Sequence, residues 1–535
     1  MVGPDGRHIR GFAHGAVVRT WSDDEMKHQT DVQPYLHLPE LVERFYAVGE
    51  WTIVDHHRAH ATGAYEASPF RSALVVSFDG GGNDGAFLAY YASRGTLTKL
   101  ATLDYNFGEA YTNIAEILPE VAGTRAALDF FCNATRAAGD ARAAGDGGVE
   151  FFDKPEDLRE LKGRLGFAGK LMGFAAAGTP RDELLLDLYD WFEESAASQG
   201  GRYGHLPRVY GAELQRVACA DGSPEALRDV AATAQLMFER FVVDIVGQLL
   251  AHVGGAAAVD GVVLTGGCAL NVLANQAVRD ALGVELFVPP SPNDGGLGPG
   301  GAWALAPPSR TVVHHQYAGF RLWDLDALPG AAAARGAVSL EALGGVDFLA
   351  KLLNSDAAAS GRKPIIAIVR GRQEYGPRAL GHRSLVAVPD TDEVRARMNR
   401  LKFREWYRPV APMIADDDLE AAFGADVRSP YMSLAPRLTE ATARGFPALA
   451  HLDGTARHQS VGPADEPWVH ALLLAVKALT GLGALINTSF NTRGKPICNT
   501  VAAALAMLDD LDDLDFVLVE DWLFAKPGRD VAAYF

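Results

Sequence analysis

The chain has 535 residues, of which 48% are hydrophobic and 22% are charged, an ordinary balance for a globular protein. This length exceeds what one hydrophobic core usually supports, so the sequence predicts two domains. With 49 Lys and Arg residues against 67 Asp and Glu, the net charge of -18 argues against a general affinity for nucleic acid or for anionic membranes.

The sequence shows no signal for export, for membrane insertion or for a cysteine framework. Residues 1–8 lack the apolar stretch of a signal peptide, and no long uncharged apolar run predicts a membrane span. The four cysteines are scattered without Cys-x-x-Cys spacing, which indicates neither a zinc site nor a disulfide framework. We therefore expect a cytoplasmic protein.

A histidine pair and an acid follow the first two predicted strands. After a strand at 51–54, His56 and His60 lie on one face if the chain turns helical, because they are four residues apart. This spacing suits a shared metal, although a structural histidine pair is the more frequent case. The buried strand 73–78 then ends in Asp79 and three glycines, which favours a carboxylate beside phosphate or metal. A turn cap is the alternative role for Asp79.

The middle of the chain contains further segments that suit a nucleotide. Lys170 lies at a predicted helix start, where it either reaches a ligand or is solvated. Residues 236–250 predict an amphipathic helix that packs in the core. The strand 261–264 opens into Gly266 and Gly267, and a Gly-Gly turn of this kind presents N–H groups to a phosphate.

A second acid completes a candidate metal set. Asp294 follows a strand at 284–288 and precedes a glycine-rich helix start. Together with His56, His60 and Asp79 it would supply two imidazoles and two carboxylates, which suit iron, manganese or zinc.

The last third of the chain collects cations in turns. Pro-, Gly- and Ala-rich residues at 307–335 predict a domain boundary, and a buried strand at 365–369 then ends in an arginine-rich loop. In so acidic a chain, arginines in Gly- and Asn-rich turns predict a phosphate-binding site, with a solvated basic loop as the alternative. The candidates are Arg378, Lys402, Arg404, Arg408, Arg457 and Arg493, and the turn after the strand 483–486 adds Asn487, Ser489 and Asn491.

Taken in order, these motifs resemble the NodU/CmcH family of O-carbamoyltransferases, which make carbamate esters on antibiotics and nodulation factors. From residue 56 on, the matching segments are His-His-x-x-His-Ala, Asp79 with its glycines, Gly-Lys-Leu-Met-Gly, Gly-Gly-x-Ala-Leu-Asn, Asn-Asp-Gly-Gly, Gly-Pro-Arg-Ala-Leu-Gly-His-Arg-Ser, Lys-Phe-Arg-Glu, Asp-Gly-Thr-Ala-Arg and Asn-Thr-Ser-Phe-Asn-x-Arg-Gly. Each motif alone is weak, and their order and number make the resemblance specific.

The resemblance implies an α/β and α+β chain: an actin-like (ASKHA) domain at 1–315, a linker at 316–340 and a YrdC-like domain at 341–535. The YrdC-like domain would join carbamoyl phosphate and ATP, with Mg²⁺, into carbamoyl adenylate. The actin-like domain would move the carbamoyl group to a hydroxyl of a natural product, as in antibiotic biosynthesis, and release AMP. The implied metal is iron, and the sequence leaves zinc and manganese open.

The resemblance also implies roles for the candidate residues. Cations that would neutralise the phosphates and act in catalysis are Arg378, Lys402, Arg408, Arg457 and Arg493. Substrate would be bound by Arg404, Asn487, Ser489 and Asn491, and the nucleotide by Lys170, Gly266, Gly267 and Asn271. The metal would be held by His56, His60, Asp79 and Asp294. The implied partner is a small-molecule hydroxyl acceptor, not nucleic acid or a membrane, and a homodimer is left open.

Two departures from the family pattern bear on these expectations. Family members usually begin with a strand and a glycine turn with a His-Asp pair, well before the His-His motif, which starts here at residue 56. We therefore expect residues 1–55 to supply only the later part of the first sheet, with an edge or face left uncovered and weak transfer. His382 stands where the family usually has Asn. An ASKHA phosphotransferase for a small metabolite and a non-catalytic relative are the rival functions.

Overall fold

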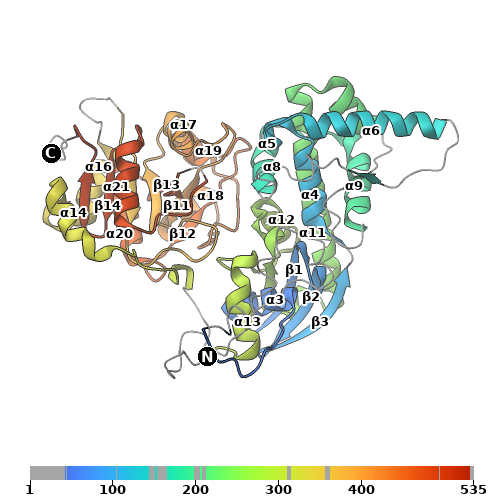
Figure 1. The fold of residues 1–535 in the computed structure, drawn as a ribbon, viewed down its shortest axis with the longest axis horizontal. Coiled ribbons are helices and arrows are strands. Elements are labelled where there is room, and N and C mark those ends of the chain that lie inside the picture. Colours follow the sequence, from blue (N-terminus) through green and yellow to red (C-terminus); the bar gives the residue numbers. More distant parts are fainter. Residues whose placement is uncertain are drawn as a thin grey trace. The chain divides into compact units, whose positions relative to one another are not determined.

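The computed structural model divides the chain into two units, residues 1–313 and residues 314–535 (Figure 1). It describes residues 43, 45–103, 105–143, 151–153, 166–197, 205–207, 212–309, 315–355, 362–492 and 494–529. Each unit holds a sheet and helices, which confirms the expected mixed α/β and α+β class. The actin-like and YrdC-like assignments stay predictions. Among the described residues, no helix combines the length and apolar composition that crossing a membrane requires.

The main sheet of unit 1 has five strands in the order β3-β2-β1-β6-β7. The antiparallel strands are β1 (Ser72–Gly82), β2 (Gly85–Ser93) and β3 (Thr96–Leu103), whereas β6 (Gly261–Thr265) and β7 (Leu286–Phe287) run parallel to β1. Because Ser77 pairs with Thr265 in the parallel ladder, the residues that follow each of them leave the sheet at the same edge. This register brings Asp79 next to the glycine turn after β6.

Helices cover both faces of this sheet. On one face, Ala61 and Ala64 of α3 (His56–Ala67) pack in a buried cluster with Val75 and Leu88. On the other face, a chain of ring contacts leads from Phe78 in β1 to the helices α4 (Phe107–Glu116) and α11 (Pro224–His252), through Phe87, Phe107 and Phe238. The predicted core helix at 236–250 is thus part of a longer helix that begins at Pro224.

Helix α13 (Leu297–Leu305) crosses α3 in close contact (Figure 1). A Cβ atom on Gly300 would lie 2.0 Å from the carbonyl oxygen of Ala59, so only glycine allows this approach. The short helix η8 (Asp294–Gly296) leads directly into α13. The crossing therefore sets Asp294 beside the first turns of α3.

The remaining elements of unit 1 lie mostly between β3 and β6. They are α5 (Pro119–Ala122), α6 (Ala126–Ala143), α8 (Phe167–Ala175), α9 (Leu185–Ala197), α10 (Ala212–Gln215), α12 (Val272–Leu282) and the two-stranded sheet of β4 (Phe151–Asp153) and β5 (His205–Pro207).

A disulfide joins Cys132 of α6 to Cys219 of the π-helical segment η5 (Arg216–Asp221). The expectation that the cysteines form no disulfide is therefore wrong. The two residues are 87 positions apart, and only the packing of the helices brings them together, so their spacing in the sequence contains no signal. Cys268 and Cys498 are free thiols.

Unit 2 is built on an eight-stranded mixed sheet in the order β12-β11-β13-β10-β9-β14-β15-β8. Its strands are β8 (Val338–Ser339), β9 (Ile366–Val369), β10 (Arg383–Ala387), β11 (Ala411–Ala415), β12 (Gln459–Val461), β13 (Ala484–Ser489), β14 (Phe516–Val519) and β15 (Trp522–Ala525). The loop between β9 and β10 and the loops that enter β11 and β12 contain most of the predicted cations.

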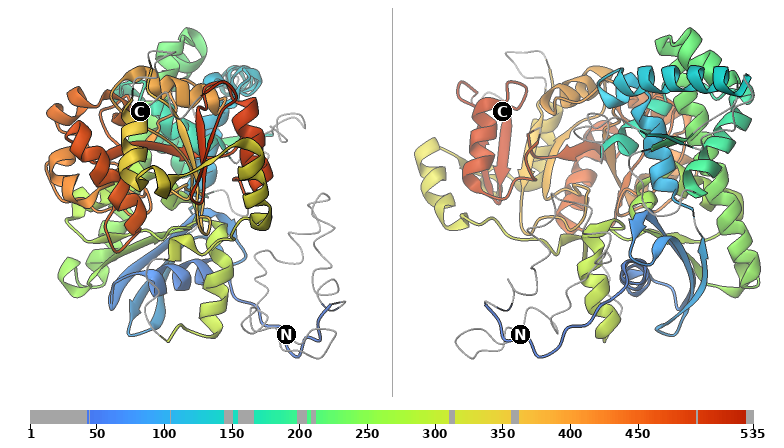
Figure 2. Two further views of the ribbon diagram at one scale, coloured as in Figure 1. Left: turned by 90° about the vertical axis from the view of Figure 1, so that its left-hand side faces the viewer. Right: turned by 45° about the vertical axis from the view of Figure 1, so that its right-hand side comes forward.

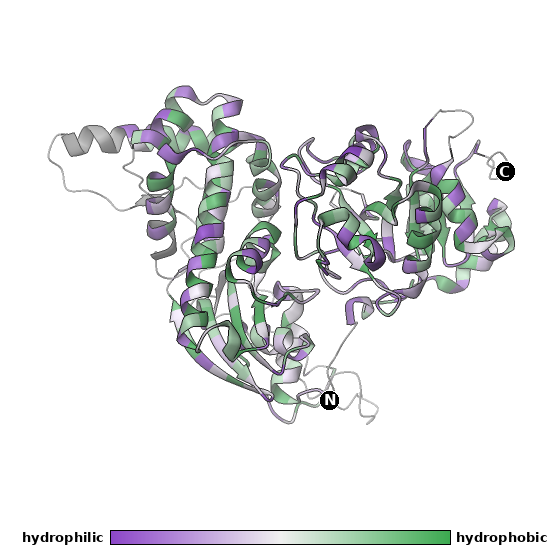
Figure 3. Cartoon of the chain, turned by 180° about the vertical axis from the view of Figure 1, so that it is seen from behind, coloured by the Kyte–Doolittle hydropathy of each residue, from purple (hydrophilic) through white to green (hydrophobic). Residues whose placement is uncertain are grey.

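Helices flank both faces of the second sheet (Figure 2). Side chains of α16 (Gly345–Asn354) and α20 (Pro467–Thr480) form one buried cluster with the sheet. Those of α14 (Leu328–Arg335), α17 (Asp392–Leu401) and α21 (Val501–Asp510) form another on the opposite face. The shorter helices are α15 (Leu340–Leu343), α18 (Leu419–Phe423) and α19 (Glu440–Gly445). In Figure 3 the hydrophobic residues, coloured green, are concentrated on the strands and on the helix sides that face them.

The segment 316–340, which we expected to be a linker, is an ordered part of unit 2. It contains α14, whose Leu328 and Ala332 are buried in the core, and β8, which pairs with β15. Composition predicted a domain boundary at 307–335, and the two units divide at 313 and 314, within that segment. Its alanines also favour the helix α14, since alanine has the highest helix propensity.

Residues 45–55 contribute no strand to the main sheet of unit 1. Most of the segment to which the prediction about the first sheet refers, residues 1–42, lies outside the described residues. That prediction is untested.

Candidate functional sites

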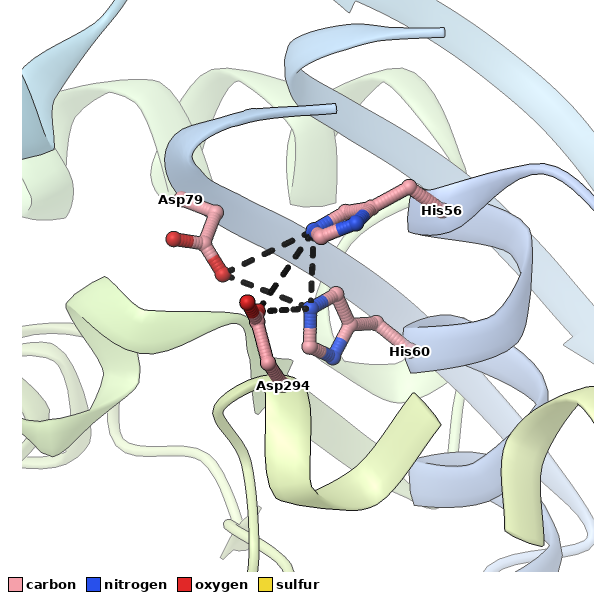
Figure 4. Close-up of side chains that lie close together, drawn as sticks. All are labelled: His56, His60, Asp79 and Asp294. Atoms are coloured by element: carbon pink, nitrogen blue, oxygen red, sulfur yellow. Dashed lines mark hydrogen bonds and ion pairs between the residues drawn. The ribbon is translucent and has the colours of Figure 1, made fainter. Parts of the chain in front are cut away.

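Four side chains from three elements converge at one end of the first sheet (Figure 4). His56 and His60 come from the first turns of α3, Asp79 from β1 and Asp294 from η8. The predicted metal set is thus brought together, with ligand atoms within 4.8 Å of one another. The histidines are buried, whereas the Asp294 side chain is 69% exposed, so the site opens on the side of Asp294.

The distances between these atoms fit one transition-metal ion. The two Nε2 atoms lie 3.1 Å apart. Oδ2 of Asp79 lies 3.8 Å from Nε2 of His56 and 3.3 Å from Nε2 of His60, and Oδ1 of Asp294 lies 3.8 Å and 3.6 Å from the same atoms. Ligands about 2.1 Å from a tetrahedral ion are about 3.4 Å apart. The two imidazoles and two carboxylates are a donor set that zinc, iron and manganese accept.

The turn between β1 and β2 caps the helix that holds the histidines. Oδ1 of Asn83 accepts the backbone N–H of His56 at 2.9 Å, and Oδ1 of Asp84 accepts that of His57 at 3.1 Å. Gly82 of the same hairpin lies against the His56 ring, where a Cβ atom would come within 2.6 Å. One hairpin therefore supplies Asp79, satisfies the first N–H groups of α3 and fixes the place of a second ligand.

His57, the remaining histidine of the motif, is a structural residue. Its Nε2 lies 2.9 Å from the carbonyl oxygen of Gly85, which can only accept, so Nε2 has the proton and Nδ1 accepts from Oγ of Ser77 at 2.7 Å. Burial, and the charges of His56 and His60, lower the pKa of His57 to about 3. The neutral ring joins α3 to both strands of the hairpin.

The carboxylate of Asp79 stays ionised in this site. Burial opposes its charge, but hydrogen bonds from His56 and His60 and from the N–H of Gly267 hold its pKa well below the ordinary value. Burial likewise opposes a charge on His60, and the bonds to Asp294 and Asp79 nevertheless raise its pKa. Nδ1 of neither His56 nor His60 has a hydrogen-bond partner among the described residues. Packing therefore holds the rings, with Nε2 turned to the carboxylates.

The residues predicted to hold the nucleotide make internal contacts. Gly267 gives its N–H to Oδ2 of Asp79 at 2.8 Å. Asn271 caps α12 through the N–H of Ala274 and exchanges hydrogen bonds with Gln235. Gly266 has a positive φ, and its N–H donates to Pro292. Their role with a nucleotide stays a prediction, and the contact with Asp79 gives Gly267 a role in the metal site.

Lys170 lies in α8, where its Nζ donates to the carbonyl of Val121 at 3.3 Å and lies 5.7 Å from the ring of Phe167. These contacts tie α8 to α5 within unit 1. The prediction that Lys170 reaches a ligand is untested.

In unit 2, four of the predicted arginines form one positively charged cluster: Arg378, Arg404, Arg408 and Arg457. Burial, with the charge of Arg408, lowers the pKa of Arg378 to about 10. Burial and the neighbouring arginines lower that of Arg404 to about 10 and that of Arg457 well below its ordinary value. Within the described part of the unit, Arg408 alone of the four is ion-paired, with Glu405 at 3.9 Å. Partly buried like charges, of which only Arg408 has an ion-pair partner among the described residues, suit an anionic ligand.

Lys402 lies beside this cluster, and its ammonium group is hydrogen-bonded to the neighbouring loop. Its Nζ donates to the carbonyl oxygens of Ser489 and Asn491, both at 2.6 Å, and contacts both side chains. Burial, and the charge of Arg404, lower its pKa to about 7. Lys402 therefore fixes the predicted substrate loop, and Ser489 and Asn491 are its partners. Arg493 lies outside the described residues.

Two buried amides hold the loop of Arg378 and leave acceptor atoms unpaired. Nδ2 of Asn487 donates to the carbonyl of Ala379 at 2.8 Å, and Nε2 of Gln459 donates to that of Leu380 at 3.1 Å. Since these carbonyls can only accept, the amide oxygens of Asn487 and Gln459 point elsewhere. Both oxygens are buried without a partner in the described part of the chain.

His451 positions Arg457 within the cluster. Its Nε2 accepts the backbone N–H of Arg457 at 3.1 Å, and its Nδ1 lies 3.0 Å from Oγ1 of Thr455. Burial is the main cause that lowers the pKa of His451 to about 4. The ring is therefore neutral at neutral pH, as its role as an acceptor requires.

The sequence analysis missed several residues that shape these sites: Asn83, Asp84, His451 and Gln459. The Asn-Asp-Gly turn after three glycines is a recognisable hairpin signal, so the capping turn was accessible from the sequence. His451 and Gln459 have no such local signal, because their partners lie in other loops or are defined only by the fold.

Two family models match the chain: "Carbamoyltransferase N-terminus" over residues 45–303 and "Carbamoyltransferase C-terminus" over residues 357–526. Together they include both clusters of side chains described above.

Named relatives are similar over large parts of the chain. Nodulation protein NolO of Bradyrhizobium diazoefficiens is 30% identical over 86% of this chain and 77% of its own length. Nodulation protein U of Sinorhizobium fredii is 30% identical over 68% of this chain and 64% of its own length. The 3'-hydroxymethylcephem-O-carbamoyltransferase of Amycolatopsis lactamdurans is 39% identical over 32% of this chain and 33% of its own length.

The chain thus spans under two thirds of nodulation protein U. Among solved structures, the crystal structure of T. kodakarensis HypF matches 55% of this chain and 41% of its own, with a TM-score of 0.29 and 18% identity. A likeness at this level supports no conclusion.

Proposed function

This chain belongs to the carbamoyltransferase family, and from this premise we propose that it is an O-carbamoyltransferase that uses carbamoyl phosphate and ATP. In this proposal unit 2 is YrdC-like and forms carbamoyl adenylate, and unit 1 is actin-like and transfers the carbamoyl group to a hydroxyl of a small natural product. Localisation in the cytoplasm and a role in antibiotic biosynthesis belong to the same proposal.

The observation that supports it most is the combination of cations and unpaired acceptors in unit 2. The arginine cluster has the charge that carbamoyl phosphate and ATP require. Among the described residues, the amide oxygens of Asn487 and Gln459 are buried acceptors without partners, and leaving one unsatisfied costs about 1–3 kcal/mol. A carbamoyl group differs from other small acyl groups in its NH₂, which would donate to such atoms.

The first reaction would form carbamoyl adenylate. Water releases inorganic phosphate from carbamoyl phosphate and leaves carbamate, whose oxygen attacks the α-phosphorus of ATP. The bond from this phosphorus to the bridging oxygen breaks and pyrophosphate leaves. Arg378, Arg404 and Arg457 would stabilise the charge that develops on the phosphoryl oxygens, and Mg²⁺ would accompany the ATP.

In the second reaction the acceptor hydroxyl attacks the carbamoyl carbon, loses its proton, and AMP leaves. A divalent ion held by His56, His60, Asp79 and Asp294 would supply a Lewis acid at this site. Iron is the ion proposed from the family resemblance, and the four donors also suit zinc or manganese. The exposed side of the site, at Asp294, would admit the substrates.

Pyrophosphate release tests the proposal. With ATP, Mg²⁺ and carbamoyl phosphate the protein should release pyrophosphate without an acceptor, and Arg378→Ala should slow this about 100-fold or more, since a charge-stabilising group is lost. Arg428→Ala is the matched control, because Arg428 pairs with Asp416 and Asp465 and should leave the rate unchanged. Release of ADP with a phosphorylated metabolite would favour the phosphotransferase function instead, and no turnover would favour the non-catalytic one.

A further inference from the structure

The loop that contains Arg378 is folded around one buried carboxylate. Oε1 of Glu374, a residue that is 5% exposed, accepts three backbone N–H groups: from Leu380 at 2.7 Å, from His382 at 2.8 Å and from Arg383 at 3.1 Å. No other side chain in the described part of this loop gathers three of its N–H groups. The carboxylate thus closes the loop into a ring that spans Arg378.

Neutral side-chain donors bind the carbonyl groups of the same loop. Asn487 and Gln459 donate to the carbonyls of Ala379 and Leu380, and the hydroxyl of Tyr317 donates to that of Leu380 at 2.8 Å. The carbonyls of the residues after Arg378 are therefore satisfied from one side and the N–H groups by Glu374 from the other. The backbone that follows Arg378 has little freedom.

This rigidity has an electrostatic reason. Arg378 lies near Arg408 and Arg457; burial first, and the like charge of the neighbouring arginines second, lower the pKa of Arg378 and of Arg457. The same repulsion favours an open loop in which Arg378 leaves the cluster. Charge-assisted hydrogen bonds to a carboxylate are about twice as strong as neutral ones, so Glu374 is the contact best suited to oppose that opening.

We propose that Glu374 is a positioning residue that holds Arg378 in the arginine cluster of unit 2. This inference rests on the part of the proposed function in which the arginine cluster binds phosphate groups, and not on the carbamoyl chemistry. Glu374 acts through the loop backbone and leaves contact with the ligand to Arg378.

A double-mutant cycle on phosphate binding tests this role. The affinity of the full-length protein for inorganic phosphate and for pyrophosphate is measured by calorimetry, for Glu374→Leu, for Arg378→Ala and for the pair. We expect Glu374→Leu to weaken binding about tenfold or more. In the Arg378→Ala background it should change binding by less than about twofold, because the residue through which it acts is gone.

Further variants separate positioning from general stability. Glu374→Gln keeps an oxygen that can accept the three N–H groups but loses the charge, so its phosphate affinity should lie between those of the native protein and of Glu374→Leu. Glu374→Asp keeps the charge but shortens the reach and should lose affinity, which serves the same cycle if Glu374→Leu does not fold. Glu520→Leu is the matched control: Glu520 accepts the N–H of Gly371 at the other end of the loop, and its loss should leave phosphate affinity unchanged.

Three outcomes would overturn the inference: native phosphate affinity in Glu374→Leu, additive losses in the double variant, or an equal loss in Glu520→Leu. Failure of the proposed function has a different signature, in which phosphate binds and depends on Glu374 but no pyrophosphate is released from ATP and carbamoyl phosphate.

Discussion

At the scale of single residues, Asp79 connects the candidate metal centre to the glycine turn after β6. Its Oδ2 lies 3.3 Å from Nε2 of His60 and accepts the N–H of Gly267 at 2.8 Å. A carboxylate that is both a ligand and a backbone acceptor is fixed in orientation before any ion arrives. The site is thus preorganised on its buried side and opens at Asp294, whose side chain is 69% exposed.

Removal of one imidazole tests whether these four residues hold an ion. His60→Ala should contain at least about tenfold less transition metal than the native protein, because the remaining three donors leave one side of the ion open. Elemental analysis of purified protein measures this. His470→Ala is the control, since His470 pairs with Asp417 in unit 2. Equal metal content in the native protein and in His60→Ala would show that the four residues do not hold the metal.

His451 predicts how stability depends on pH. Its pKa in the folded state, about 4, lies below its ordinary value of 6.5. The unfolded chain therefore binds the proton more readily, so the stabilisation is complete above pH 6.5 and is lost as the pH falls toward 4. At pH 5 the loss is about 1–2 kcal/mol for this one group.

Urea unfolding at pH 7 and pH 5 measures this effect. In His451→Gln, which has no ionisable ring but keeps an acceptor for the N–H of Arg457, the free energy of unfolding should fall by about 1–2 kcal/mol less between the two pH values than in the native protein. An identical pH dependence in both proteins would mean that His451 is not the group responsible.

At the scale of elements, the hairpin of β1 and β2 determines where α3 begins. Asn83 and Asp84 accept the N–H groups of His56 and His57, and the ring of His57 donates to the carbonyl of Gly85 and accepts from the hydroxyl of Ser77. The first turn of the helix cannot shift along the sheet without breaking these bonds. The hairpin therefore fixes the start of the helix, and this holds the Nε2 atoms of His56 and His60 at 3.1 Å from each other.

Two glycines of this hairpin provide a matched test. Gly82→Ala should displace the His56 ring, since the new Cβ would lie 2.6 Å from its Cγ, and weaken zinc or iron binding about 10- to 100-fold. Gly80→Ala, on the same strand, meets no atom within 4 Å and should bind the metal as the native protein does. Metal titration against a competing chelator gives both affinities. Equal affinities in the two variants would argue that the contact with Gly82 does not set the ring.

At the scale of the whole molecule, the two clusters belong to different units, residues 1–313 and 314–535. The imidazole and carboxylate cluster lies in the first, and the arginine cluster lies in the second. The proposed reaction has two chemical steps, so each unit would contain the site for one of them.

Variants in the two clusters should then differ in which of the two chemical steps they lose. His56→Ala should release pyrophosphate at about the native rate and carbamoylate the acceptor at least about 100-fold more slowly, whereas Arg378→Ala should fail in both steps. Pyrophosphate release and formation of the carbamate ester are measured on the same protein samples. If His56→Ala lost the first step as completely as Arg378→Ala, the assignment of one step to each unit would be wrong.

The sequence by itself determined the local features of this protein. The His-x-x-x-His spacing, the acids at strand ends and the arginine-rich turns all lie within windows of about ten residues, where helix periodicity and turn chemistry act. The order of these motifs also indicated the family, which the family models confirm. The composition of residues 307–335 pointed to the region where the two units divide, but it did not distinguish a linker from the helix α14.

Only the tertiary structure decided which distant residues meet. Cys132 and Cys219 are 87 residues apart. Arg378 comes close enough to Arg457 to affect its pKa because the loop after β9 reaches the start of β12, where Gln459 donates to Leu380. The three N–H groups on Glu374 likewise depend on strand order and loop closure. So do the oxygens of Gln459 and Asn487, which have no partner in the described part of the chain. Such contacts depend on packing across the whole unit, and a local window of sequence does not encode that packing.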